Sequence, residues 1–165
     1  MSMETNIDYL QTRREQVRKQ IEHLLKEFVD EVPGVAHALL TTRDALPLVD
    51  SGITREFKEK WSAITGTLAS LAENIPGPTG GTGNVRTVTI ERNDAIFVLC
   101  GAGFSKDFPA TDDDTQDDDT EDDDTEETVL VVVCYPNTKM TTVGFEMGRL
   151  VDRFAQYLRE SRRVL

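Results

Sequence analysis

At 165 residues the chain has the length of one domain and is long enough to bury a hydrophobic core. Its formal net charge of −12 is local, because residues 112–127 contain twelve of the 30 acidic side chains and no basic one. The other 18 acidic residues balance the 18 basic ones, and a chain without a basic surplus is not expected to bind nucleic acid.

The two cysteines, Cys100 and Cys134, lie in apolar runs, and two thiols at this spacing form neither a disulfide framework nor a metal site. The first residues lack the apolar core of a signal peptide, and no apolar run approaches the roughly 18 residues of a membrane span. We expect a cytoplasmic protein that reaches a membrane only through partners, with no cofactor, no metal and no direct membrane insertion.

The first half of the chain predicts a helix followed by two strands. Apolar residues recur at helical spacing from residue 17 to residue 32, within a first helix over residues 6–31. The first turns of this helix are basic and poor in apolar residues, so we expect them to project. Pro33 and Gly34 end the helix, and a strand follows over residues 35–42. Pro47 suits the edge position of a short strand over residues 46–50.

The second helix, which is expected to begin after Thr54, has an unusual pattern. Its large apolar residues are four and three positions apart and form a narrow seam: Phe57, Trp61, Ile64, Leu68, Leu71 and Ile75. Small side chains flank that seam: Ser62, Ala63, Thr65, Gly66, Thr67, Ala69, Ser70 and Ala72. Because small residues let another backbone come close, we favour a surface for a second subunit. The alternative is that the chain's own sheet and a neighbouring helix bury both faces.

The second half predicts three strands and a last helix. A connection rich in Gly and Pro over residues 75–83 leads to an alternating strand over residues 85–92, and a nearly all-apolar strand covers residues 95–100. Residues 129–135 are all apolar or aromatic and rich in β-branched side chains, which predicts a central strand covered on both faces. A helix follows over residues 138–162.

Residues 104–127 separate two strands that a tight hairpin would otherwise join. Within them the pattern Asp-Asp-Asp-Thr-Gln/Glu occurs three times, from residues 112, 117 and 122. Like-charge repulsion keeps such a run extended, so we interpret residues 104–127 as a disordered acidic insert within a single domain over residues 1–165. Calcium binding is an alternative, although no glycine interrupts the run and no EF-hand spacing fits. In another alternative, the acidic insert folds back and contacts Arg13, Arg14, Arg18 or the carboxyl-terminal arginines.

Two phrases resemble those of a known family: FVDEVPGVAHALL over residues 28–40 and TVGFEMGRLV over residues 142–151. With the order helix, strand, strand, helix, three strands, helix, the chain resembles the Roadblock/dynein light chain family over about residues 15 to 158. It looks closest to bacterial members encoded beside Ras-like small GTPases in actinobacterial operons. The resemblance implies an α/β (α+β) sandwich. In it the second helix covers one face of a five-stranded antiparallel sheet, the first and third helices cover the other, and the last strand lies in the middle.

The resemblance also implies a homodimer that pairs through the second helix and the strand after it. Mapped onto this chain, the dimer interface comprises Ser62, Thr65, Gly66, Ala69, Val85, Thr87 and Thr89. The paired helices would form a platform for the switch region of a Ras-like small GTPase, made of Glu59, Ser62, Ala63, Gly66, Thr67 and Ser70. We therefore expect a regulatory or scaffold protein of the GTPase-activating type in a bacterial signalling complex, with a sensor kinase complex as a further partner.

The sequence does not separate this role from that of a pure scaffold, and it fits two other functions less well. A pure scaffold would bind the GTPase without changing its rates. A ligand-sensing domain of the PAS or GAF type would need a cavity with a few polar groups, whereas among the middle strands only His37 stands out, and a lone histidine on a strand is more often structural. An enzyme is least expected, because two histidines and two buried-looking cysteines leave no nucleophile paired with a base. We name no catalytic residue.

Overall fold

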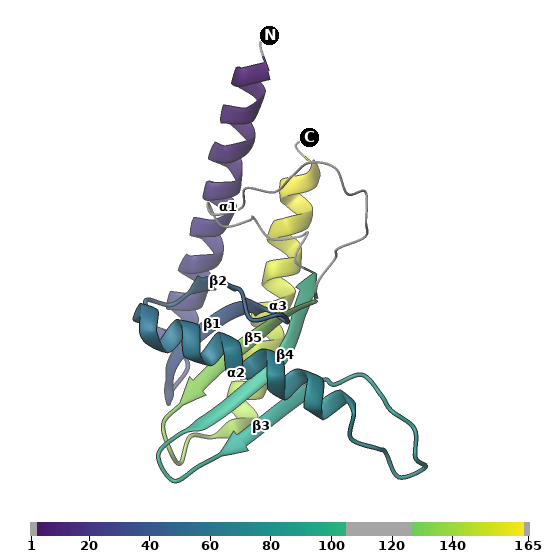
Figure 1. Cartoon of the computed structure of the whole chain (residues 1–165). Helices are drawn as coiled ribbons and strands as arrows, with labels where there is room; N and C mark the ends of the chain where they lie inside the picture. Colours follow the sequence, from purple (N-terminus) through teal and green to yellow (C-terminus); the bar gives the residue numbers. More distant parts are fainter. Residues whose placement is uncertain (1–2, 105–126, 164–165) are drawn as a thin grey trace.

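The computed structural model describes residues 3–104 and 127–163, which form one antiparallel sheet covered by helices on both faces. In chain order the elements are α1 (Met3–Glu31), β1 (Val35–Thr42), β2 (Pro47–Asp50), α2 (Arg55–Glu73), β3 (Thr87–Glu91), β4 (Ile96–Phe104), β5 (Glu127–Cys134) and α3 (Met140–Arg163). The strands lie in the order β2-β1-β5-β4-β3, with α2 on one face and α1 and α3 on the other (Figure 1). The expected sandwich and its strand order are confirmed.

The last strand, β5, lies in the centre of the sheet, as its apolar run predicts. It pairs with β1 on one side and with β4 on the other, and every side chain from Thr128 to Cys134 is buried. The prediction was wrong at one residue. Tyr135 lies beyond the strand and is 63% exposed, although its backbone N–H still donates to the carbonyl oxygen of Gly34, 2.9 Å away.

The two faces of the sheet carry separate clusters of apolar side chains, because neighbouring residues of a strand point to opposite faces. Toward α1 and α3, the buried residues Leu130 and Val132 of β5 pack with residues of both helices. Toward α2, Val129 and Val131 pack in a smaller cluster with Leu39 and Leu99. The α1–α3 face therefore supplies most of the core, and the α2 face supplies the rest.

Some boundaries differ from the expected ones. α1 begins at Met3, and its first turns project beyond the sheet as expected (Figure 1). β3 begins at Thr87, so Val85 lies before the strand. The expected insert was too wide, because Phe104 ends β4 and Glu127 begins β5. Residues 105–126, the remainder of that acidic segment, lie outside the described residues. No helix in the described ranges combines the length and apolarity that crossing a membrane requires.

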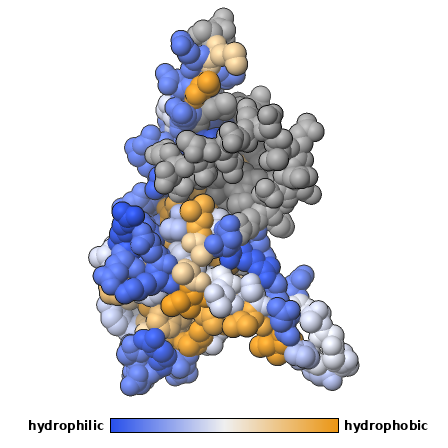
Figure 2. Space-filling model, viewed as in Figure 1, coloured by the Kyte–Doolittle hydropathy of each residue, from blue (hydrophilic) through white to orange (hydrophobic). Residues whose placement is uncertain are grey.

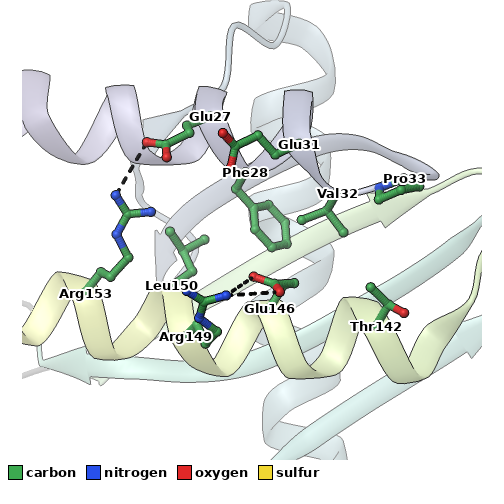
Figure 3. Close-up of a pocket in the computed structure, with 10 residues that line it drawn as sticks. All are labelled: Glu27, Phe28, Glu31, Val32, Pro33, Thr142, Glu146, Arg149, Leu150 and Arg153. Atoms are coloured by element: carbon green, nitrogen blue, oxygen red, sulfur yellow. Dashed lines mark hydrogen bonds and ion pairs between the residues drawn. The ribbon is translucent and has the colours of Figure 1, made fainter.

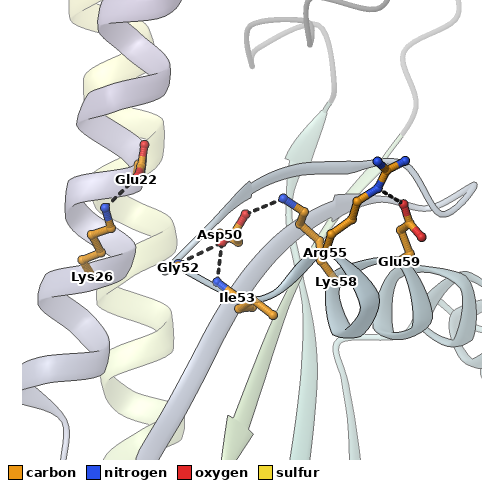
Figure 4. Close-up of polar contacts among 8 residues, drawn as sticks. All are labelled: Glu22, Lys26, Asp50, Gly52, Ile53, Arg55, Lys58 and Glu59. Carbon is orange, nitrogen blue, oxygen red and sulfur yellow. Dashed lines mark hydrogen bonds and ion pairs between the residues drawn. The ribbon is translucent and has the colours of Figure 1, made fainter.

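Three contacts hold α2 against the sheet. At its start, the carboxylate of Asp50 accepts hydrogen bonds from the N–H groups of Gly52 and Ile53 and from Lys58 Nζ, at 2.8, 2.7 and 3.1 Å (Figure 4). At its end, the Arg43 guanidinium pairs with Glu73 of α2 and lies 3.5 Å from a carboxylate oxygen of Glu127. Arg43 thereby ties the end of α2 to the start of β5.

The third contact, in the middle of α2, sets how the helix is rotated. Ser62 and Thr65 are 0% and 3% exposed, and Gly66 is buried with them. A Cβ atom added to Gly66 would lie 2.4 Å from the carbonyl oxygen of Arg43, so the helix backbone lies almost against the β1–β2 turn. The sheet of the chain itself therefore buries this small-residue side of α2. The expectation that these three residues meet a second subunit is wrong.

Replacing Gly66 with alanine tests this close approach. Alanine in a helix normally stabilises by about 0.5–1 kcal/mol relative to glycine. At Gly66 the added methyl group would push α2 off the Arg43 carbonyl, and we expect a net loss of about 1–3 kcal/mol. Gly148→Ala is the matched control, because an added Cβ there meets nothing within 4 Å. Urea denaturation should rank Gly148→Ala above wild type and Gly66→Ala below it. Equal stabilisation of both variants would contradict the packing.

Asp50 gives a second test through pH. Burial opposes ionisation of this carboxyl, but the N–H donors of Ile53 and Gly52 and the Lys58 ammonium outweigh it and hold the pKa of Asp50 below its ordinary value. A depressed pKa stabilises the fold above the unfolded value of 3.8, and that stability is lost as the pH falls through the lower folded pKa.

We expect Asp50→Asn to cost about 1–2 kcal/mol at pH 7, the typical size of hydrogen bonds to a charged group. The gap between variant and wild type should shrink below about pH 4, as measured by urea unfolding at several pH values. Asp152→Asn, at an exposed position of α3, controls for the loss of one negative charge. A gap that stays constant down to pH 2.5 would refute the role of the ionised carboxylate.

Candidate partner-binding surface

The outward side of α2 and the chain just beyond its end carry an apolar strip that consists of Phe57, Ile64, Leu71 and Ile75. These side chains are 50%, 56%, 60% and 68% exposed, whereas Trp61 and Leu68 of the same seam are half-buried. Figure 2 shows hydrophobic surface gathered over α2 and the strands next to it. A soluble protein rarely leaves so many large apolar side chains together in water without a partner, so the apolar strip is a candidate interaction surface.

The rotation of α2 explains why this strip is exposed. A helix resting on a sheet buries only one side, and the side with Ser62, Thr65 and Gly66 comes closest to β1 and β2. Trp61 and Leu68 reach the small cluster around Leu39 and Leu99 from the flank of the helix. The remaining large residues of the seam have no strand beneath them and face solvent.

An open strand edge lies next to the strip. Within the described residues β3 is hydrogen-bonded to β4 only, in register from Thr87 opposite Cys100 to Glu91 opposite Ile96. Val88 of β3 packs in the same cluster as Trp61 and Leu68, which joins the open edge to α2. An edge strand presents a row of backbone N–H and C=O groups with which another chain can pair. The β3 edge therefore lies beside the flank of α2 that carries Trp61 and Leu68, next to the apolar strip.

The structure divides the residues that the sequence suggested for partner contacts. Ser62, Thr65 and Gly66 are buried in the molecule, so they belong neither to a dimer interface nor to a GTPase platform. Ala69 is half-buried on α2, and Val85 is half-buried before β3. Six others are exposed on α2 or on the edge strand: Glu59, Ala63, Thr67, Ser70, Thr87 and Thr89.

Sequence reasoning missed the apolar strip itself. The spacing of four and three residues marks the seam, but the sequence analysis places the partner surface on the small residues that flank it. The same spacing is the signature of a seam between two helices. A signal that could have found the strip was the glycine on the opposite flank, since Gly66 marks the side on which another backbone comes closest.

Two aromatic contacts fix the start of α2. The Phe57 and Trp61 rings stack with centroids 5.5 Å apart, and the Trp61 ring lies tilted at 5.4 Å from the His37 ring of β1. His37 thus has a packing partner on the sheet, in agreement with a structural role for this histidine. The stack leaves half of the Phe57 surface exposed at one end of the strip.

A groove of about 290 Å³ lies between α1 and α3, on the face opposite α2. Its apolar lining comes from Phe28, Val32, Pro33 and Leu150, and the rest of the lining is polar or charged (Figure 3). Glu146 Oε1 is 3.4 Å from Arg149 Nη1, and Glu27 Oε2 is 3.5 Å from Arg153 Nη2. These carboxylates are engaged by arginines, and the described residues include no group of three or more acidic, His or Cys side chains able to hold a metal ion.

The cysteine thiols behave as small apolar groups. Burial raises the pKa of Cys100 to about 11 and that of Cys134 to about 11, so both thiols stay protonated at neutral pH. Both side chains pack on the α1–α3 face of the sheet. The described surface offers apolar contacts on α2 and backbone hydrogen bonds at the β3 edge.

Comparison with solved structures supports the fold. The structure is similar to a Roadblock/LC7 domain from Streptomyces avermitilis, with 23% identity, a TM-score of 0.64, and 84% of this chain and 97% of that chain covered. It is also similar to MglB with a tetrameric arrangement (13% identity, TM-score 0.64, 88% and 92% covered) and to the gliding protein MglB of Thermus thermophilus (14%, 0.62, 87% and 92%). No curated protein matches the sequence significantly.

At these levels of identity the structural matches show the fold alone. The sequence itself places the chain more closely, because residues 21–104 match the family model of the Roadblock/LC7 domain. That match covers half of the chain and runs from α1 through β4, so it includes α2 and β3. The protein therefore belongs to the Roadblock/LC7 family.

Proposed function

We propose that the protein is a dimeric regulator that binds a Ras-like small GTPase in a bacterial signalling complex and modulates its nucleotide cycle. The observation that carries the proposal is the apolar strip on α2 beside the open edge of β3. Membership of the Roadblock/LC7 family supports the proposal. A relative of the same fold, MglB, has been solved in a tetrameric arrangement, which is a precedent for association on this fold.

In the proposed homodimer, the β3 strands of two copies pair along their free edges and the two α2 helices lie side by side. Backbone pairing at β3 joins the two sheets into one, as in other cases of strand addition. The α2 helices then cover each other's apolar strips, and Leu71 and Ile64 lose their contact with water. Thr87 and Thr89, exposed on the edge strand, would flank the new ladder.

The exposed small and polar residues Glu59, Ala63, Thr67 and Ser70 would form the GTPase platform on the paired helices. The three basic side chains of α2 are all engaged: Arg55 with Glu59 at 2.7 Å, Lys60 with Glu56 at 2.7 Å, and Lys58 with Asp50. α2 therefore offers no unpaired arginine to the nucleotide. We propose that this partner acts by reshaping the switch loops rather than by inserting an arginine finger.

Leu71→Asp tests the dimer. An aspartate in the middle of a buried apolar seam should weaken association at least tenfold, which corresponds to the loss of roughly 1.5–3 kcal/mol of side-chain burial. Phe145→Asp is the matched control, because Phe145 is 67% exposed but lies on α3 at the opposite face. Sedimentation velocity should show dissociation of Leu71→Asp at concentrations where Phe145→Asp and wild type associate. At concentrations low enough for both variants to be monomeric, Leu71→Asp and Phe145→Asp should melt at similar temperatures. A wild-type protein that stays monomeric at about 100 µM would refute the dimer.

The regulatory role is tested with a Ras-like GTPase from the same genome. GTP hydrolysis and nucleotide exchange are measured with and without the protein, and with Thr67→Arg, which places a bulky charge on the platform. We expect the wild-type protein to change at least one rate severalfold and Thr67→Arg to abolish that change while remaining dimeric. A complex without any change in rate would favour a pure scaffold. The absence of both a complex and a rate change would overturn the proposal.

A further inference from the structure

The amino-terminal half of α1 runs on alone, past the rest of the described fold. The antiparallel helices α1 and α3 are in register where Glu27 meets Arg153, 3.5 Å apart. α3 ends ten residues later, at Arg163, which is level with about residue 17 of α1. α1 continues to Met3, and Figure 1 shows this part projecting beyond the sheet and α3. We call residues 3–16 the α1 extension; it is roughly 21 Å long.

The face of α1 that packs against the core continues into the α1 extension. In the core, Val17 and Leu24 are seven residues apart, as are Ile21 and Phe28, and the last three are 0–6% exposed. Met3 and Ile7 fall at the same heptad positions but are 85% and 53% exposed. Met3 and Ile7 therefore continue the apolar positions of this stripe beyond the last described surface that it can cover, with Arg14 standing between Ile7 and Ile21 in the same frame.

An exposed apolar stripe on a helix of this length calls for a partner. Isolated helices shorter than about 12–15 residues are marginal in water, and most helical stability in proteins comes from packing of the apolar face. The α1 extension has about that length and nothing described to pack on. A second helix laid along Met3 and Ile7 would supply the missing contact.

The charged side chains of the α1 extension indicate which kind of helix could pair with it. Glu4 and Asp8 lie in its first turns, and Arg13 and Arg14 lie near its other end. Glu4, Asp8 and Arg14 have no ion pair among the described residues, whereas one guanidinium nitrogen of Arg13 is already buried within the chain. Two extensions aligned antiparallel over residues 3–14 would place Glu4 of each near Arg14 of the other. Parallel alignment would set like charges against like.

We propose that the α1 extension is a self-association surface that pairs antiparallel with the same segment of a second copy. Ile7 of each copy lies near the centre of the pair, and the Glu4 and Arg14 contacts close both ends. The second half of α1 packs over β1 and β2, whereas β3 is the opposite edge of the sheet. The extension and the β3 edge can therefore be occupied at the same time, and dimers formed through α2 and β3 would join into larger assemblies.

The test uses charge exchange in the full-length chain. Glu4→Arg and Arg14→Glu should each weaken the pair, because each sets like charges against one another across the interface. The double variant Glu4→Arg/Arg14→Glu restores opposite charges at both ends and should recover association. Sedimentation velocity at about 100 µM should give wild type and the double variant twice the mass of either single variant. Raising the salt concentration should reduce the mass of the associating forms.

Ile7→Asp is the apolar arm of the same test. We expect it to halve the mass of the assembly without lowering the melting temperature, because Ile7 packs on nothing described within its own fold. An unchanged mass would overturn the proposal. The proposal would also be overturned if Arg14→Glu lost association and the double variant Glu4→Arg/Arg14→Glu did not recover it. That result would indicate instead that the acidic residues 112–127 bind the arginines.

Measurements in the Leu71→Asp background separate this interface from the α2–β3 surface. If the extension pairs as proposed, Leu71→Asp leaves a dimer that Ile7→Asp converts to a monomer. If only the α2–β3 surface is real, Leu71→Asp alone gives the monomer. If neither surface associates, the wild type and all variants are monomers, and both proposals fail.

Discussion

The close approach of Gly66 to the carbonyl oxygen of Arg43 determines the arrangement of the α2 face. With no side chain at that point, the helix backbone lies almost against the β1–β2 turn, and Ser62 and Thr65 on the same side are buried with it. Once that side is fixed, the geometry of a helix leaves no choice for the residues opposite. Phe57, Ile64, Leu71 and Ile75 are directed toward solvent, so one small residue exposes four large ones.

The two faces of the sheet are closed to different degrees. α1 and α3 together cover one face with a continuous cluster that includes Ile21, Leu150 and Phe154. Among the described residues, the other face has α2 alone, and the buried cluster there consists of Leu39, Ile53, Leu99, Val129 and Val131. Val88 and Phe97, toward the β3 edge, are half-buried. A single helix cannot cover a five-stranded sheet, which is why the uncovered apolar area gathers beside β3.

Much of the fold was predictable because its signals are local. The unbroken apolar run of β5 required cover on both faces, Pro47 required an edge, and Pro33 with Gly34 required a helix end. The rotation of α2 was not predictable from the same kind of pattern. A seam spaced by four and three residues fits a core and an interface equally well, and a flank of small residues fits both as well. The choice depends on how near the β1–β2 turn comes, a contact between residues 23 positions apart that no local spacing encodes.

The same reasoning explains why α1 differs along its length. Its apolar residues keep one heptad frame from Met3 to Phe28, interrupted at Arg14, but the fold supplies a surface only for the second half. On α2 the close approach of Gly66 to the β1–β2 turn directs the apolar seam outward. On α1 the helix extends beyond the sheet and α3. In both cases the sequence pattern is that of a buried helix, and the tertiary structure decides which part is buried. Because α1 lies over β1 and β2 and the open edge is β3, the two uncovered stripes lie apart, and a partner on one leaves the other free.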